Sequence, residues 1–144
     1  PDLDTEALYD EPMCVAVSPT HALAKRRKVG WADLAALPWV VPPAWASSRI
    51  KLNQQFYKAG LNPPVDLVET ASFLGTLSFL QQRGAVVFWA RSVAMHLQQQ
   101  GLARVLPLKL PIELPPVGMI TMRSRSRTPA CEQLMQFLRA GSRR

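Results

Sequence analysis

Short apolar runs alternate along the chain with segments whose apolar residues recur at helical spacing. Apolar runs bounded by turn residues are typical of buried strands, and helical spacing is typical of amphipathic helices. The predicted strands are Met13–Val17, Trp39–Val41, Val65–Glu69, Ala85–Ala90, Ala103–Leu110 and Val117–Met122. The predicted helices lie within 29–38, 47–59, 73–84, 92–101 and 128–141. Strands that alternate with helices over short loops predict an α/β fold with a mostly parallel sheet.

Particular residues predict where these helices begin and end. Ser72 is placed to cap the helix that follows it, and Thr128 stands as the N-cap before Pro129 at the favoured first position. Gly60 and Gly141 are placed to end their helices, because glycine readily adopts the left-handed conformation of a helix C-terminus.

The composition is that of a folded domain, with 48% hydrophobic and 19% charged residues among 144. No apolar run reaches the roughly 18 residues of a membrane span, and the acidic start PDLDTE differs from a secretory signal. Because the first residue is Pro1 and not Met, we expect a piece of a longer protein. Cys14 lies in an apolar run and Cys131 in a helix-like one, and neither has neighbours that would make its thiol reactive. This favours reduced, buried thiols and a cytoplasmic location over a disulfide or redox switch.

The net charge of +7 comes from two local clusters. One is KRRK at Lys25–Lys28, and the other holds six arginines against one glutamate between Arg123 and Arg144. Separate clusters without interleaved aromatic residues favour solvated loop and tail charge over a nucleic-acid-binding face.

Signals for catalysis are absent from the sequence, which contains no GxGxxG, GxxxxGK[ST] or GxSxG motif. His21 and His96 have no neighbouring Cys, Asp or Glu at metal-ligand spacing. This favours a turn position for His21 and a surface or packing position on a helix for His96. We therefore predict no catalytic residue, no metal site and no cofactor.

Binding chemistry is better supported at the start of the second predicted helix. Trp45, Ser47, Ser48 and Arg49 gather there, where unpaired backbone N–H groups and the helix dipole favour anions. One hydroxyl suffices to cap the helix. Two hydroxyls together with an aromatic ring and a guanidinium indicate a small-anion site with the tryptophan as its wall.

A second strand-to-helix switch repeats the arrangement at ETAS, Glu69–Ser72. In open α/β sheets ligands collect at the carboxyl ends of the strands, so we expect both segments to border one crevice. Trp89 ends a third apolar strand and is either a core residue or a further wall of this crevice.

Four stretches that cover nearly the whole chain occur in a familiar order. They are EPMCVAVSPTHALAKRRKVGWADLAALPWVV, SRIKLNQQFYKAGLNPP with the ETAS after it, RGAVVFWARSVA, and PPVGMITMRSRSRTPACEQLMQFLR. In this order they resemble the effector-binding region of LysR-type transcriptional regulators. Two departures are Ala22 in place of the family's proline after histidine, and Arg83-Gly84-Ala85 in place of the more usual Gly-x-Gly.

The resemblance implies a three-layer α/β lobe of the type 2 periplasmic-binding-protein fold. Residues 1–12 would be a remnant of lobe I with the first hinge, and residues 13–110 would be lobe II. Residues 111–144 would hold the second hinge, at the prolines of Pro111–Pro116, and the closing strand and helix of lobe I. The DNA-binding domain, the linker helix and the first part of lobe I would then lie upstream of Pro1.

The resemblance also implies a function without catalysis. A small organic inducer would bind between the lobes, with Ala46–Ser48, Thr70–Ser72 and the surroundings of Trp89 as the share of lobe II. An aromatic compound or a carboxylate would suit the Trp and Ser/Arg surroundings. The partners would be this effector and operator DNA, the latter through the missing domain, with no membrane. The full-length protein would be a homodimer or tetramer.

Three alternatives remain open on the sequence alone. The chain would suit a lobe of a solute-binding protein for transport, which an upstream secretory leader would favour. It would also suit a fragment of an α/β enzyme, whose acid/base pair or nucleophile would lie in the missing segment. Finally, the basic clusters would suit a nucleic-acid site, which strong and salt-dependent DNA affinity would reveal.

Overall fold

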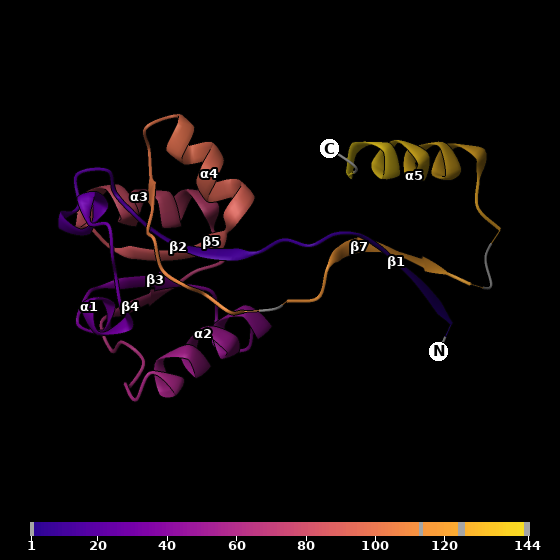
Figure 1. Ribbon diagram of the computed structural model, residues 1–144. Coiled ribbons are helices and arrows are strands. Elements are labelled where there is room, and N and C mark those ends of the chain that lie inside the picture. The colour runs from indigo at the N-terminus through magenta and orange to yellow at the C-terminus, as the bar shows by residue number, and fades with distance from the viewer. Residues whose placement is uncertain (1, 113, 124–125, 143–144) are drawn as a thin grey trace. The chain divides into compact units, whose positions relative to one another are not determined.

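The computed structural model describes residues 2–112, 114–123 and 126–142. The chain divides into two compact units (Figure 1). Unit 2 comprises Pro12–Glu113, and unit 1 combines Pro1–Glu11 with Leu114–Arg144.

Unit 2 is built on a five-stranded sheet with the order β4-β3-β5-β2-β6. Its strands are β2 (Met13–Val17), β3 (Trp39–Val41), β4 (Leu67–Glu69), β5 (Val86–Ala90) and β6 (Arg104–Val105). β3 pairs in parallel with β4 and β5, whereas β2 pairs antiparallel with both β5 and β6. All strands except β2 therefore share one direction, and the predicted α/β fold with a mostly parallel sheet is confirmed.

Helices cover both faces of this sheet (Figure 1). They are the 3₁₀ helix η1 (Ala22–Lys25), α1 (Trp31–Ala35), α2 (Ser47–Lys58), α3 (Phe73–Arg83) and α4 (Arg91–Gln99). On one face Leu80 of α3 and Leu97 of α4 join a buried cluster with Val40 and Val87 of the sheet. On the other face Phe56 of α2 packs edge-on against Trp39, with ring centroids 5.5 Å apart. Because strand side chains alternate between the faces of a sheet, the neighbouring residues Trp39 and Val40 of β3 pack against helices on opposite faces.

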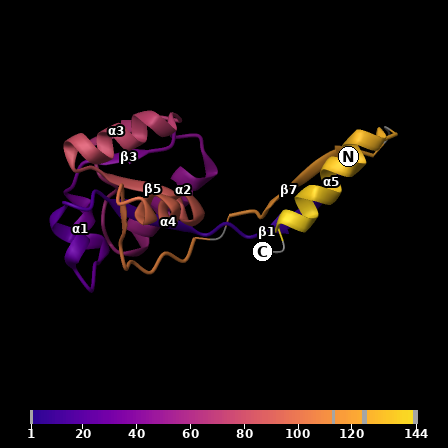
Figure 2. The same ribbon diagram turned by 90° about the horizontal axis from the view of Figure 1, so that it is seen from above.

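Unit 1 consists of two antiparallel strands and a helix. β1 (Leu3–Tyr9) pairs with β7 (Val117–Met122), and α5 (Pro129–Ser142) lies along them (Figures 1 and 2). Gly118 permits the close pairing, because a Cβ on it would collide with the carbonyl oxygen of Glu6. Met135 is the buried residue of α5.

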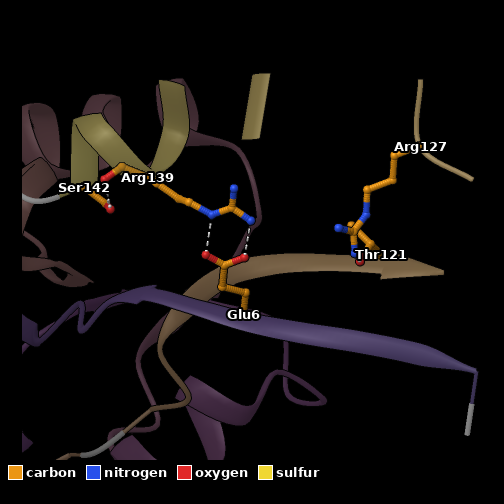
Figure 3. Close-up of polar contacts among 5 residues, drawn as sticks. All are labelled: Glu6, Thr121, Arg127, Arg139 and Ser142. Atoms are coloured by element: carbon orange, nitrogen blue, oxygen red, sulfur yellow. Dashed lines mark hydrogen bonds and ion pairs between the residues drawn. The ribbon is translucent and has the colours of Figure 1, made fainter. Parts of the chain in front are cut away.

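An ion pair joins the helix of unit 1 to its sheet (Figure 3). Arg139 donates from Nε and Nη2 to the two carboxylate oxygens of Glu6, at 2.6 and 2.7 Å. This forked hydrogen bond holds the pKa of Glu6 below its ordinary value and raises that of Arg139. Nearby, Arg127 donates to the hydroxyl of Thr121 at 3.1 Å.

The C-terminal arginines have local partners where the structure describes them. Besides Arg127 and Arg139, Arg123 forms an ion pair with Asp4 at 2.9 Å. Arg125, Arg143 and Arg144 lie outside the described residues. Local pairing of this kind supports the interpretation of this cluster as surface charge.

Most predicted helix boundaries are confirmed. The side chain of Ser72 accepts from the N–H of Gly75, and that of Thr128 accepts from Cys131. Gly60 follows the end of α2 with a φ of 72°. The prediction that Gly141 ends the last helix is wrong, because α5 continues to Ser142.

The strand predictions were less accurate at their ends. β6 is much shorter than the predicted Ala103–Leu110, because Pro107 has no N–H to continue a ladder. β4 begins at Leu67, two residues after the 96%-exposed Val65. Neither β1 nor η1 was predicted. The predicted hinge segment Pro111–Pro116 includes residue 113, which lies outside the described residues.

Candidate functional site

A cavity of about 400 Å³ opens in unit 2 where three neighbouring parallel strands end. Its lining comes from the ends of β3 and β5 and from the segments that follow β3 and β4, which is the place where open α/β sheets bind ligands. The described lining residues are Val40, Val41, Pro42, Pro43, Trp45, Ala46, Thr70, Ala71, Phe73, Thr76, Phe88 and Trp89.

The cavity brings together five of the nine predicted site residues. Trp45 and Ala46 line it from the β3 side, Thr70 and Ala71 from the β4 side, and Trp89 from β5. The expectation that both strand-to-helix switches border one crevice is therefore confirmed. Ser47, Ser48, Arg49 and Ser72 are not among the lining residues.

Aromatic side chains form much of the cavity wall. Trp45 is 81% exposed, and Phe73 is 46% exposed. The rings of Phe73 and Trp89 pack with centroids 5.8 Å apart and an interplanar angle of 31°. Exposed aromatic faces of this kind offer a flat apolar surface to the ring or hydrocarbon part of a ligand.

The start of α2 lies beside this wall without a side-chain cap. Its N-cap is Ala46, a lining residue, and the first intrahelical bond runs from the Ile50 N–H to the Ala46 carbonyl at 3.1 Å. The interpretation that one of the two serines caps the helix is therefore wrong. The N–H groups of Ser47, Ser48 and Arg49 precede that first bond and stay available to an acceptor.

Arg49 does not serve the cavity as predicted. It lies on the buried face of α2 with Leu52 and Phe56, and it is 6% exposed. Its Nε and Nη1 atoms are buried and have no hydrogen-bond partner in the described part of the chain. The predicted forked contact from Arg49 to an anion in this cavity is not supported by this position.

Ser72 has a structural role at the start of α3. Its hydroxyl accepts from the Gly75 N–H at 3.1 Å, and its own N–H donates to the Thr70 hydroxyl at 3.0 Å. The hydroxyl of Thr76 donates to the Ser72 carbonyl at 2.9 Å. These bonds fix Thr70, Phe73 and Thr76 along one side of the cavity.

The family model described as LysR substrate binding domain matches residues 1–143. The chain belongs to this family. The resemblance to LysR-type regulators stated from the motifs is thereby confirmed, and the cavity lies in a LysR substrate-binding domain.

Individual relatives agree with this assignment. The chain is 24% identical over 140 residues to the HTH-type transcriptional regulator GbpR of Azospirillum brasilense, covering 96% of the chain and 41% of that protein. The chain therefore spans well under half of this curated relative.

Solved structures show the same fold. The AmpR effector-binding domain from Citrobacter freundii has a TM-score of 0.74 at 21% identity, over 99% of this chain and 68% of that one. The effector-binding domain of QuiR in complex with shikimate has a TM-score of 0.75 at 14% identity, over 99% of this chain and 66% of that one.

Several cavity residues of this LysR domain were not predicted. Phe73 and Thr76 belong to the first turn of α3. An apolar and a small side chain at these positions are equally typical of a helix packed in the core, so the sequence did not mark them as cavity residues. Pro42 and Pro43 could have been predicted more easily as lining residues. Two prolines directly after a buried strand end its pairing, which places them at the carboxyl end of the strand.

The histidines and cysteines of the domain lie elsewhere. The Nδ1 of His21 accepts from the Leu23 N–H at 3.1 Å at the start of η1, and burial lowers the pKa of His21. The exposed His96 bonds to Gln100 on α4. Cys14 is buried as predicted, whereas Cys131 is only half-buried, and both are free thiols.

Residues 2–112, 114–123 and 126–142 hold neither a candidate metal site nor a candidate membrane span. Within these ranges no group of three or more His, Cys, Asp or Glu side chains is placed to hold a metal ion. None of the helices there has the length and apolar character needed to cross a membrane.

Proposed function

We propose that this LysR domain binds a small organic acid in the cavity of unit 2, as the effector-sensing part of a DNA-binding transcriptional regulator. The observation that carries the proposal is the uncapped start of α2 beside an aromatic wall. The acid group and the hydrocarbon part of such a ligand each have a matching surface there.

The acid group would bind at the start of α2. Three unpaired N–H groups and the positive end of the helix dipole favour a carboxylate. The half-buried Ser48 lies in the same turn and offers a hydroxyl donor at its edge. No arginine is required, which fits the buried position of Arg49 away from the cavity lining.

The body of the ligand would pack against Trp45, Trp89 and Phe73. The cavity of about 400 Å³ is within the range of about 300–1,000 Å³ that is usual for small-molecule sites. The hydroxyls of Thr70 and Thr76 supply the few polar groups in an otherwise apolar lining. Shikimate, the ligand of the QuiR domain, is a ring carboxylate, and a molecule of this chemistry suits both surfaces.

The two units fit a division between two lobes. Unit 2 would be lobe II, and unit 1 would hold the closing strand and helix of lobe I, close to the predicted boundaries 13–110 and 111–144. An effector that favours one arrangement of the lobes shifts the population of regulator conformations. This function is binding without catalysis. Operator recognition belongs to a separate DNA-binding domain of a cytoplasmic homo-oligomer.

A panel of small carboxylates, shikimate and benzoate among them, tests the proposal by thermal shift and tryptophan fluorescence. We expect at least one acid to raise the melting temperature and change the emission of Trp45 or Trp89. Its neutral amide should have a much smaller effect, because the helix start binds negative charge.

Two matched variants locate the binding. Trp45→Ala removes an exposed wall residue and should weaken binding about tenfold or more with an unchanged melting temperature. Tyr57→Ala removes another exposed aromatic side chain of unit 2, outside the cavity lining, and should bind like the wild type. The proposal fails if no acid in the panel binds, or if Trp45→Ala binds as tightly as the wild type.

A further inference from the structure

A second cavity of about 640 Å³ lies on unit 2 and shares no residue with the first. It lies between α4 and the edge strand β6, with the segment from η1 along its side. Its lining includes the apolar side chains of Met95 and Leu106 and the polar side chain of Gln98. Its rim carries the cationic side chains of Lys25, Arg26, Arg27, Arg91 and Arg104.

Four of these five cations lack neutralising partners in the described part of the chain. Arg26 forms an ion pair with Asp33 at 3.1 Å. Within the described part of the chain, Lys25, Arg27, Arg91 and Arg104 have no ion pair, and no acidic residue is among the described lining residues. Like charges gathered around one groove repel each other, so a bound anion would relieve this repulsion.

The position of Arg91 adds to the positive potential. It is the first residue of α4, whose N-cap Ala90 provides no side-chain cap and whose first turn holds no acidic residue. A cation at a helix N-terminus opposes the helix dipole, whereas an anion there is stabilised by it.

The cations are spread along the groove. Arg104 is paired with Val17 at one end of β2, while Ala90, the neighbour of Arg91, is paired with Met13 at the other end. The strand between these ends is about 14 Å long at 3.4 Å per residue. An extended ligand with several anionic groups can therefore contact both ends at once.

We propose that this groove binds a small, extended polyanion of the polyphosphate class, such as the phosphate chain of a nucleoside triphosphate. Its volume is in the small-molecule range. A concave groove with cationic side chains along its rim suits a compact ligand better than the exposed backbone of duplex DNA, which is contacted by protruding side chains.

Calorimetric titration with sodium tripolyphosphate, pyrophosphate and phosphate tests the proposal. We expect saturable binding of one tripolyphosphate per chain, weaker binding of pyrophosphate and weakest of phosphate. Affinity should fall as sodium chloride is raised, because ionic contacts are screened.

Single substitutions assign the binding to the groove. Arg91→Gln and Arg104→Gln should each weaken tripolyphosphate binding about tenfold, the effect of one lost charge-assisted hydrogen bond. Arg123→Gln makes the same charge change on an exposed residue of unit 1 and should leave the affinity unchanged. Trp45→Ala should also leave it unchanged, which separates this groove from the acid-binding cavity.

Three results would overturn the proposal. The first is an absence of tripolyphosphate binding at low ionic strength. The second is an equal loss of affinity in Arg91→Gln and Arg123→Gln. The third is a random-sequence DNA duplex that binds more tightly than tripolyphosphate and loses affinity with Arg91→Gln, since the groove would then belong to a nucleic-acid surface.

Discussion

A buried guanidinium on α2 is the most unusual single residue of the domain. Arg49 is 6% exposed, and two of its nitrogen atoms have no hydrogen-bond partner in the described residues. A buried donor without an acceptor costs about 1–3 kcal/mol relative to one that is solvated. An apolar side chain of similar length at this position would avoid this cost.

The variant Arg49→Met tests this cost. We expect the free energy of unfolding to rise by about 1 kcal/mol or more, because the buried volume is retained and the unpaired donors are removed. Chemical denaturation of both proteins measures the difference. Lys58→Met, an exposed change on the same helix, should stay within about 0.5 kcal/mol of the wild type. A clear loss of stability in Arg49→Met would show that the guanidinium has a necessary partner.

Residue types and their places along the chain were enough to predict part of the cavity. Trp45, Thr70 and Trp89 each follow or end an apolar strand, so parallel pairing alone brings them to one edge. The burial of Arg49 could not be predicted in this way, because it depends on which face of α2 meets the sheet. The helical spacing of apolar residues did not show which of the neighbouring positions on α2 would face the sheet.

At the scale of elements, β1 shows why an alternating pattern can be missed. Its half-buried positions are Asp4, Glu6 and Leu8, while Leu3 is exposed. Two of the three inward positions are acidic, so hydropathy gives no strand signal. Glu6 is accommodated there because Arg139 of α5 neutralises it, a contact between residues far apart in the sequence.

This ion pair should make the stability of unit 1 depend on pH. The folded-state pKa of Glu6 is lowered from 4.5, chiefly by its hydrogen bond with Arg139. The stabilisation is therefore complete above the unfolded pKa and is lost as the pH falls through the lower folded value.

Thermal unfolding of the wild type and Glu6→Gln across this pH range measures the effect. The wild type should melt higher at neutral pH, and the two melting temperatures should converge in acid. Asp10→Asn, a change of the same kind at an exposed residue of unit 1, should melt like the wild type. Equal melting of Glu6→Gln and the wild type at neutral pH would contradict a stabilising role for the pair.

At the scale of the whole molecule, the two units differ in how much apolar surface they bury. Unit 2 has a buried cluster on its sheet, including Val87 and Leu80. In unit 1 Met135 is the buried residue of α5, while Phe137 is 68% and Ile120 is 67% exposed. The hydrophobic contribution to stability scales with buried apolar area, so unit 1 should be the less stable unit.

Hydrogen exchange of the intact chain tests this difference. Amides of β1, β7 and α5 should exchange faster than those of β3 and β5, because opening unit 1 exposes little additional apolar surface. Mass spectrometry of peptides from each element gives the rates. Equal protection of the two sets of amides would indicate that the units unfold together.

The alternating strands and helices of the sequence predicted the layered α/β fold. The reversed direction of β2 could not be predicted from this pattern. Hydropathy marks Met13–Val17 as a buried strand in either direction. Its antiparallel placement between β5 and β6 follows from pairing across the sheet, which a local pattern does not contain.

Binding of an organic acid at the start of α2 is tested most directly by proton–nitrogen NMR of the chain titrated with shikimate and benzoate. We predict saturable shifts of the backbone amides of Ser47, Ser48 and Arg49 and of the indole N–H groups of Trp45 and Trp89. Shifts confined to other residues, with the amides of 47–49 unmoved at saturating acid, would contradict the proposed site.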